Sequence, residues 1–126
     1  MGIMQRRKGA TGERELCRLL AEHLGEPVAR SLTQARDGGD GGDVTLGRWA
    51  LEVKRQAEPK LAEWWKQAEA QARDYEIPVL AYRIDRRPWR FVVPLSAFVD
   101  WPDMPGLQWT AEIGLEAFAM LVRESV

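Results

Sequence analysis

The sequence predicts an α/β protein in which helices flank a mixed β-sheet. Apolar residues recur at helical spacing in two long segments, short strand-like runs lie between and after them, and Gly- or Pro-containing turns separate the segments. Read in chain order, these patterns give αβββαββ followed by a C-terminal extension. Because helices and strands alternate within one short chain, a single layered system is expected, and neither a barrel nor a helical bundle.

The boundaries of the predicted elements follow from local signals. Gly25 closes the first helix, Gly47 and Arg48 form the tight turn of a hairpin, and Pro59 can occupy the first turn of the second helix, which reaches Tyr75. In order, the predicted elements are a helix over 9–24, strands over 28–32, 43–46 and 49–55, a helix over 60–75, strands over 78–84 and 89–93, and a helix near 115–123.

Length and composition bound the class of protein. The chain has 126 residues and a mass of 14.3 kDa, with 45% hydrophobic and 29% charged residues, which is the composition of one globular domain and not of a disordered chain. A single domain over 1–126 is therefore expected, with a core of about 7–98 and an acidic, Trp-containing extension over 99–126. No apolar run approaches the roughly 18 residues of a membrane span, and the N-terminus has no signal-peptide core. The single cysteine, Cys17, cannot form an internal disulfide, so the cytoplasm of a bacterial, archaeal or phage-infected cell is expected.

Charge is distributed unevenly along the chain. The formal net charge of −1 excludes a globally basic nucleic-acid binder. Residues 1–93 nevertheless carry 17 Lys and Arg against 14 Asp and Glu, whereas residues 94–126 carry one Arg against five acids. The excess of Arg over Lys favours contacts with phosphate, and a GC-rich genome or a warm habitat is the alternative explanation.

Glu13 heads the apolar stripe of the first helix. Cys17, Leu20 and Leu24 follow it at i+4, i+7 and i+11, so the carboxylate is placed at the edge of the buried face. A buried carboxylate requires a cation. The alternative is an acidic residue near a helix N-terminus that is stabilised by the helix dipole.

The second strand of the hairpin carries Glu52 and Lys54 on one face, opposite to Leu51 and Val53. Asp43 opens the preceding strand, so its carboxylate is expected near the same part of the sheet. Two carboxylates there form a hard-oxygen site that suits Mg²⁺ or Mn²⁺, and Lys54 can orient a water and offset phosphate charge. The alternative for this pattern is a solvated salt bridge.

Asp37 and Asp40 compete with Asp43 for the metal site, because all three lie in or beside the glycine-rich segment DGGDGGD. Only Asp43 leads directly into a β-branched strand and is therefore preferred. Asp37 and Asp40 can instead form Asx-turns.

These blocks resemble a known family. RKGATGERELCRLL (7–20), VARS (28–31), Asp43, LEVKR (51–55), PVLAYR (78–83) and WRFV (89–92) are similar, in this order, to the archaeal-type Holliday-junction resolvases of the PD-(D/E)XK, restriction-endonuclease-like nucleases. The likeness spans about residues 7–98, and the R-K-G-x-x-x-E-R-E-L block is its most specific part. The sequence departs from the family in its DGGDGGD loop, at Trp64 and Trp65, and from Asp100 onward.

The resemblance implies a restriction-endonuclease-like core, a homodimer and Mg²⁺-dependent cleavage of four-way DNA junctions by paired, symmetric nicks. It implies that Glu13, Asp43, Glu52 and Lys54 are catalytic and that Glu13, Asp43, Glu52 and the Val53 carbonyl hold the metal. Mn²⁺ is expected to substitute for Mg²⁺. The residues expected to contact DNA are Arg7, Lys8, Arg14, Arg30, Ser31, Arg55 and Gln67.

The functional alternatives are a nuclease of the same fold that cuts a flap, a nicked or branched duplex or a restriction site, and a DNA-binding protein without turnover. The acidic extension is also a candidate surface for a replication or recombination protein. The basic residues Arg6, Arg7 and Lys8 can grip phosphates, or can simply be a solubilising terminus.

Several other side chains are expected to be structural. His23 and Cys17 are expected to pack in or beside the core. The stripe Leu61, Trp65, Ala68, Ala72 and Tyr75 is expected to be buried, with Lys60, Trp64, Gln67 and Gln71 along one flank. Among six Trp residues, some should be partly exposed, for a dimer interface or, as the alternative, for base stacking.

Overall fold

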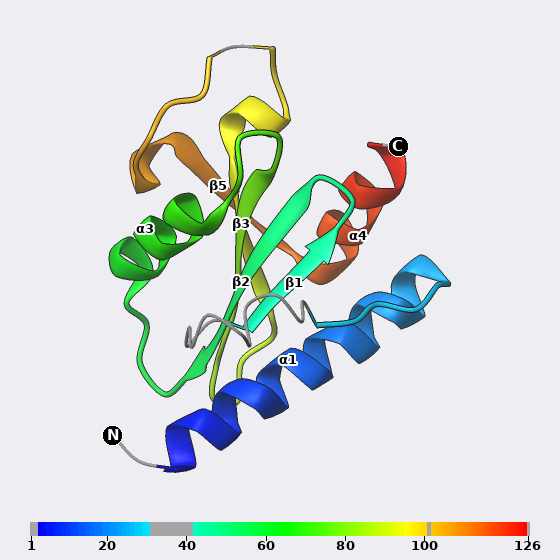
Figure 1. Ribbon diagram of the computed structural model, residues 1–126, viewed down its shortest axis with the longest axis vertical. Helices are drawn as coiled ribbons and strands as arrows, with labels where there is room; N and C mark the ends of the chain where they lie inside the picture. The colour runs from blue at the N-terminus through cyan, green and yellow to red at the C-terminus, as the bar shows by residue number, and fades with distance from the viewer. Residues whose placement is uncertain (1–2, 31–41, 101, 126) are drawn as a thin grey trace.

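The computed structural model describes residues 3–30, 42–100 and 102–125, with side chains for 11–30, 44–100 and 102–125. Its centre is a five-stranded sheet in the order β1-β2-β3-β4-β5 (Figure 1). The elements are α1 (Ile3–Leu24), β1 (Gly42–Leu46), β2 (Trp49–Gln56), α3 (Leu61–Gln71), β3 (Ile77–Ile84), β4 (Arg90–Pro94), β5 (Thr110–Gly114) and α4 (Leu115–Glu124), with short 3₁₀ turns at Leu95–Ala97 and Leu107–Trp109.

The sheet is mixed, as predicted. β1 and β2 form the antiparallel hairpin expected around Gly47, whose φ of 57° suits glycine. β2 and β3 are parallel, with α3 as the crossover between them, and β4 and β5 continue the sheet in antiparallel pairing.

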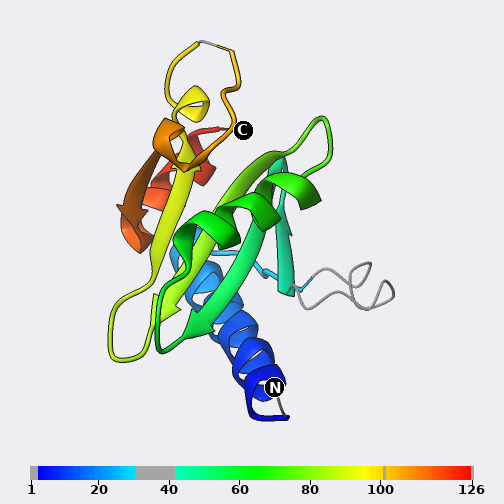
Figure 2. The ribbon, with the colours of Figure 1, turned by 90° about the vertical axis from the view of Figure 1, so that its left-hand side faces the viewer.

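Helices cover both faces of the sheet (Figure 2). α1 and α4 lie on one face over a core that includes Leu51, Val53 and Phe91, while α3 lies on the other face over Leu80 and Val92. The alternation of side chains along β2 therefore sends its apolar residues toward α1 and its even-numbered residues toward α3. The predicted α/β class with flanking helices is confirmed.

The element order differs from αβββαββ. In the predicted strand 28–32, only an isolated bridge joins Arg30 to Val44, and residues 31 and 32 lie outside the described part. β5 was not predicted, because Thr110–Gly114 contains one large aliphatic residue and ends in glycine, so its strand state depends on pairing with β4.

The helix boundaries also differ from the prediction. α1 begins at Ile3 instead of residue 9, because neither of its glycines interrupts it. α3 ends at Gln71, since Ala72 is extended. The expectation that Tyr75 belongs to the buried stripe is therefore wrong: it lies beyond the helix and is 61% exposed.

The tryptophans contribute mainly to the core. Trp49 and Trp89 are buried on the face of the sheet that α1 and α4 cover, and Trp64 and Trp65 of α3 are buried in the cluster on the other face. Trp109 is half-buried, whereas Trp101 lies outside the described residues. Trp64, predicted for the flank of α3, is thus a core residue, and the four buried rings are not available for an exposed interface.

Across the described ranges, no helix combines the length and the apolar character that crossing a membrane requires.

Candidate active site

β2 positions Glu52 and Lys54 on the face of the sheet that α3 covers. Their register partners on β3 are Leu80 and Tyr82, which pack under that helix. Glu52 is 2% exposed, and its Oε1 lies 3.5 Å from Nζ of Lys54. The predicted pair is therefore a buried ion pair and not a solvated surface bridge.

α1 positions Glu13 at the buried edge predicted from its helical spacing. Glu13 is 4% exposed, and Arg30 Nε lies 3.0 Å from its Oε2. The isolated bridge between Arg30 and Val44 places this arginine beside β1, which explains why it reaches the helix. The cation required by a buried carboxylate is thus Arg30.

The two acid–base pairs share one electrostatic environment. Burial raises the pKa of Glu13, the positive charge of Arg30 lowers it, and the negative charge of Glu52 raises it again. The negative charge of Glu52 therefore acts on the Glu13 carboxylate. The fold thus couples electrostatically a helix residue and a strand residue that are 39 positions apart in the sequence.

Asp43 lies directly opposite Glu52 in the backbone register of the β1–β2 hairpin. Its backbone is described and its side chain is not, while Asp37 and Asp40 lie outside the described residues. The preference for Asp43 over these two acids therefore stays a prediction. The backbone register is consistent with it, because directly opposite residues of an antiparallel pair lie on the same face.

A second carboxylate of α1 anchors the helix to the sheet. Glu15 Oε1 accepts hydrogen bonds from Arg83 Nη1 at 2.6 Å and from Trp89 Nε1 at 2.7 Å. Burial raises the pKa of Glu15, but these two hydrogen bonds and the charges of Arg83 and Arg55 outweigh it, so the pKa lies below its usual value. Glu15 was not singled out from the sequence, because nothing in its spacing indicates two distant partners.

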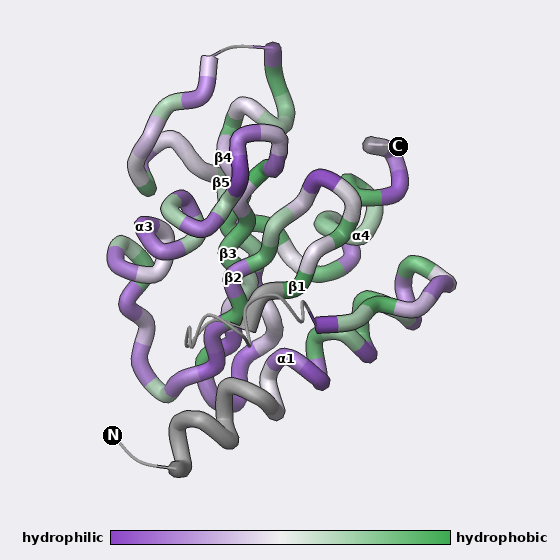
Figure 3. Tube along the Cα trace, in the orientation of Figure 1, coloured by the Kyte–Doolittle hydropathy of each residue, from purple (hydrophilic) through white to green (hydrophobic). Residues whose placement is uncertain are grey.

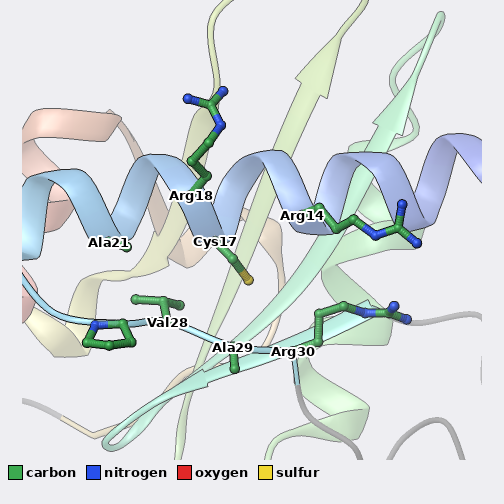
Figure 4. A pocket seen from close by; sticks show the side chains of 8 residues that line it. Arg14, Cys17, Arg18, Ala21, Val28, Ala29 and Arg30 are labelled. Carbon is green, nitrogen blue, oxygen red and sulfur yellow. The ribbon is translucent and has the colours of Figure 1, made fainter.

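A groove of about 380 Å³ runs between α1 and the segment that leads to Arg30 (Figure 4). Among the residues with described side chains, its charged lining consists of Arg14, Arg18 and Arg30 and includes no acid. Figure 4 shows the side chains of Arg14 and Arg30 extending in the same direction, with the Cys17 thiol turned toward the 28–30 segment. Cys17 is buried as predicted, and His23 Nδ1 bonds the Leu19 carbonyl at 2.9 Å.

The remaining predicted DNA contacts are placed in different parts of the fold. Arg55 is on the α1 face of β2, opposite to Lys54, where its Cβ would lie 3.1 Å from a Cβ added to Gly12. Gln67 lies on α3, and its Oε1 is buried with no hydrogen-bond partner among the described residues. Only the backbones of Arg7 and Lys8 are described, within α1, and Ser31 lies outside the described residues.

A protein-family model matches most of the chain. Residues 4–105 match the model described as "Phage putative PDDEXK endonuclease". The chain belongs to this family. The α/β fold with a mixed five-stranded sheet is consistent with the PD-(D/E)XK nucleases, and the E-x-K strand of this family member is β2. Neither the comparison with curated proteins nor that with solved structures found a match.

PD-(D/E)XK nucleases typically use a divalent metal, and the residues here fit one. Glu13 and Glu52 are buried carboxylates whose negative charges are coupled, so a divalent cation bound by their oxygens would offset this charge. In the part of the chain with described side chains, no group of three or more His, Cys, Asp or Glu forms a site. Asp43, opposite Glu52, is the candidate for the third oxygen ligand.

Proposed function

We propose that this PD-(D/E)XK endonuclease is a metal-dependent, structure-selective DNA nuclease that resolves four-way junctions by paired nicks, acting as a homodimer in the cytoplasm. The observation that supports the proposal is a pair of buried carboxylates, Glu13 and Glu52, each with a cation beside it and coupled to each other electrostatically. Buried carboxylates can bind a divalent metal, and a neighbouring lysine can stabilise the negative charge that develops when a phosphodiester is hydrolysed.

In this proposal, Glu13, Asp43, Glu52 and the Val53 carbonyl hold Mg²⁺, for which Mn²⁺ substitutes. When bound, the metal supplies Lewis-acid stabilisation of the phosphoryl oxygens. Lys54 Nζ, 13% exposed at the side-chain level and 3.5 Å from Glu52, orients the attacking water and offsets the charge that develops on the phosphate. The reaction is an in-line displacement that leaves a 5′-phosphate and a 3′-hydroxyl.

DNA binding is assigned to the basic residues beside this site. Arg14 and Arg30, which line the groove beside α1, contact the phosphates next to the scissile bond, and Arg7, Lys8, Ser31, Arg55 and Gln67 extend the contact surface. Contacts to phosphates carry no base information, so selection among DNA structures depends on shape. Binding should weaken steeply as salt concentration rises.

The second candidate is a nuclease of the same chemistry that cuts a flap, a nicked or a branched duplex. The observation in its favour is that the matched family is described only as a phage endonuclease, with no junction named. The residues at the metal site are the same in both cases, and the DNA substrate distinguishes them.

The test is cleavage of labelled four-way junction, 5′-flap, nicked duplex and linear duplex by the purified protein with Mg²⁺. We expect paired nicks in the junction at symmetric positions, and a loss of about 10²–10³-fold in rate for Glu52→Gln. The matched control is Glu116→Gln, an exposed carboxylate on α4, which should leave the rate unchanged. Preferred cleavage of the flap would support the second candidate function and contradict junction resolution. Full activity of Glu52→Gln would refute the catalytic assignment.

A further inference from the structure

The turn between β3 and β4 carries basic side chains to which the proposed function gives no role. Over residues 85–88 it contains two arginines, Arg86 and Arg87, and both are exposed. In Figures 1 and 2 this turn lies at the lower end of the molecule, where β2 ends and α1 begins. Figure 3 shows hydrophilic residues at the ends of β2 and β3 that meet there. The turn is therefore a polar projection of the sheet into solvent.

The register places this turn at the same end of the sheet as Lys54. β2 and β3 are parallel, and Lys54 pairs with Tyr82 near the end of β3. The Asp85 amide donates a hydrogen bond to the Gln56 carbonyl at 3.2 Å, so the start of the turn is still attached to β2. With a strand rise of about 3.3 Å per residue, Arg86 lies roughly 13 Å beyond the position of Tyr82. One helical turn of duplex DNA is about 34 Å long, so DNA bound at Lys54 is long enough to reach the turn.

Arg86 has a backbone conformation that favours glycine. Its φ is 67°, and among the non-glycine residues that the structure describes it is the one with a positive φ. The Arg87 amide donates to the Ile84 carbonyl at 2.9 Å, which places Arg86 at the third position of a β-turn, where Gly or Asn normally supplies a positive φ. Such strain concentrates at functional sites. Because the side chain is exposed, packing does not explain an arginine at this position.

Arg83 holds the turn against α1. Its Nε donates to the Arg87 carbonyl at 2.9 Å, and its Nη1 donates to Glu15 Oε1 at 2.6 Å. One guanidinium thus links the backbone of the turn to the helix. Arginines on a turn that is already fixed lose less conformational entropy on binding than arginines on a mobile loop.

Positive charge dominates this end of the sheet. The segments 54–60 and 83–90, which end β2 and surround the turn, carry seven Lys and Arg against two acids. Glu15, which α1 adds to this end, is already bonded to Arg83. Arg55, the register partner of Arg83, has a buried Nε without a hydrogen-bond partner among the described residues. The excess of positive charge suits a polyanion.

We propose that Arg86 and Arg87 form a further DNA-contact element, which binds the phosphate backbone of the duplex beyond the catalytic site. This inference rests on the proposed nuclease function. Guanidinium groups bind phosphate through two parallel hydrogen bonds, which suits these two side chains to the DNA backbone. Arg14 and Arg30 line the groove beside α1, so the turn is a separate element. Because phosphates carry no base information, the turn contributes affinity and orientation without sequence preference.

Fluorescence anisotropy of the full chain with a labelled duplex and a labelled four-way junction tests this contact, in EDTA so that no metal-dependent cleavage occurs. Arg86→Gly combined with Arg87→Gln should weaken binding at least about 10-fold at about 0.1 M KCl. Each phosphate contact contributes about 0.9 to the slope of log affinity against log salt concentration, so the double variant should reduce that slope by about 1.8. Arg48→Gln is the matched control: this exposed arginine lies in the β1–β2 turn, at the opposite end of β2, and should leave the affinity unchanged.

Two single variants separate binding from folding. Arg86→Gly removes the side chain and the backbone strain together, so the affinity should fall while the thermal unfolding midpoint should not. Arg87→Lys keeps the charge and should retain the salt slope that Arg87→Gln reduces. Wild-type affinity and slope in the folded double variant would overturn the proposal, and so would a wild-type chain that binds neither DNA. A lower unfolding midpoint for Arg86→Gly would give Arg86 a structural role and contradict it as well.

Cleavage with Mg²⁺ is measured separately on the same proteins and DNA. Weaker binding by the double variant, with a wild-type chain that cleaves no DNA, would support the turn contact and refute only the nuclease proposal. Unchanged binding by the double variant, with cleavage that Glu52→Gln abolishes, would refute only the turn contact.

Discussion

On α1 and β2, carboxylates are buried and each has a cation beside it, whereas in the loop that follows β4 the large apolar side chains of Phe98, Val99 and Met104 are exposed. Glu13 and Glu52 are 4% and 2% exposed and pair with Arg30 and Lys54. Burying a charge costs free energy unless a partner compensates it, and exposing apolar surface costs free energy unless a partner covers it. The buried carboxylates are therefore compensated within the chain, whereas the apolar side chains of the loop stay in contact with water.

The largest expected effect separates catalysis from association. Lys54→Ala should lower the cleavage rate about 10²–10³-fold, because it removes the cation that lies 3.5 Å from Glu52 and that is proposed to orient the attacking water. The dimer dissociation constant should not change. Single-turnover cleavage and sedimentation measure the two quantities, and Lys66→Ala, an exposed lysine on α3, is the control. If Lys54→Ala also weakened the dimer, catalysis and association would not be independent.

A smaller effect is expected where α1 approaches the sheet. A Cβ added to Gly12 would lie 3.1 Å from Arg55 Cβ and 3.7 Å from Trp89 Cη2. Gly12→Val should therefore lower the free energy of unfolding by about 1–3 kcal/mol in urea titrations. Gly12→Ala should change it little, since the helix-propensity gain of about 1 kcal/mol offsets a tight contact. Equal stability of the valine variant would show that α1 can shift without cost.

The anchor at Glu15 should make stability depend on pH. Its pKa is lower in the folded state than in the unfolded chain, so its stabilising contribution is fully present above the unfolded value of about 4.5 and is lost as pH falls through the folded pKa. Glu15→Gln should cost about 1–2 kcal/mol at pH 7 and less at pH 3, by urea unfolding at both values. A cost that does not vary with pH would show that the charge of Glu15 contributes nothing.

The smallest effect is expected on the exposed face of α1. Arg18 Nη1 lies 3.2 Å from Glu22 Oε1, and both side chains are more than half exposed (64% and 58%). Arg18→Ala should change stability by at most about 0.5 kcal/mol. Arg30→Ala should cost more, because it leaves buried Glu13 without its partner. Thermal unfolding compares the two, and equal costs would contradict the importance of burial.

Local patterns in the sequence predicted much of this architecture. The spacing of Glu13 to Cys17 and Leu20 indicated a buried carboxylate on α1, and strand alternation separated Glu52 and Lys54 from Leu51 and Val53. Both signals depend only on helical and strand periodicity, which is a property of neighbouring residues.

Features that depend on distant partners were not predictable in this way. The bonds of Glu15 to Arg83 and Trp89 join residues 68 and 74 positions apart. β5 forms because β4 provides an edge for it. The position of Tyr75 was wrong because helical spacing was continued past Gln71, where the helix ends.

One consequence of the sheet order concerns the strand that carries Glu52 and Lys54. β2 lies between an antiparallel and a parallel neighbour, so its main-chain amides bond on both edges. Amides in such a strand become accessible to solvent only when large parts of the structure open. The amides around Glu52 should therefore be among the slowest in the molecule to exchange hydrogen for deuterium, which would preserve the relative positions of these two side chains through most local openings.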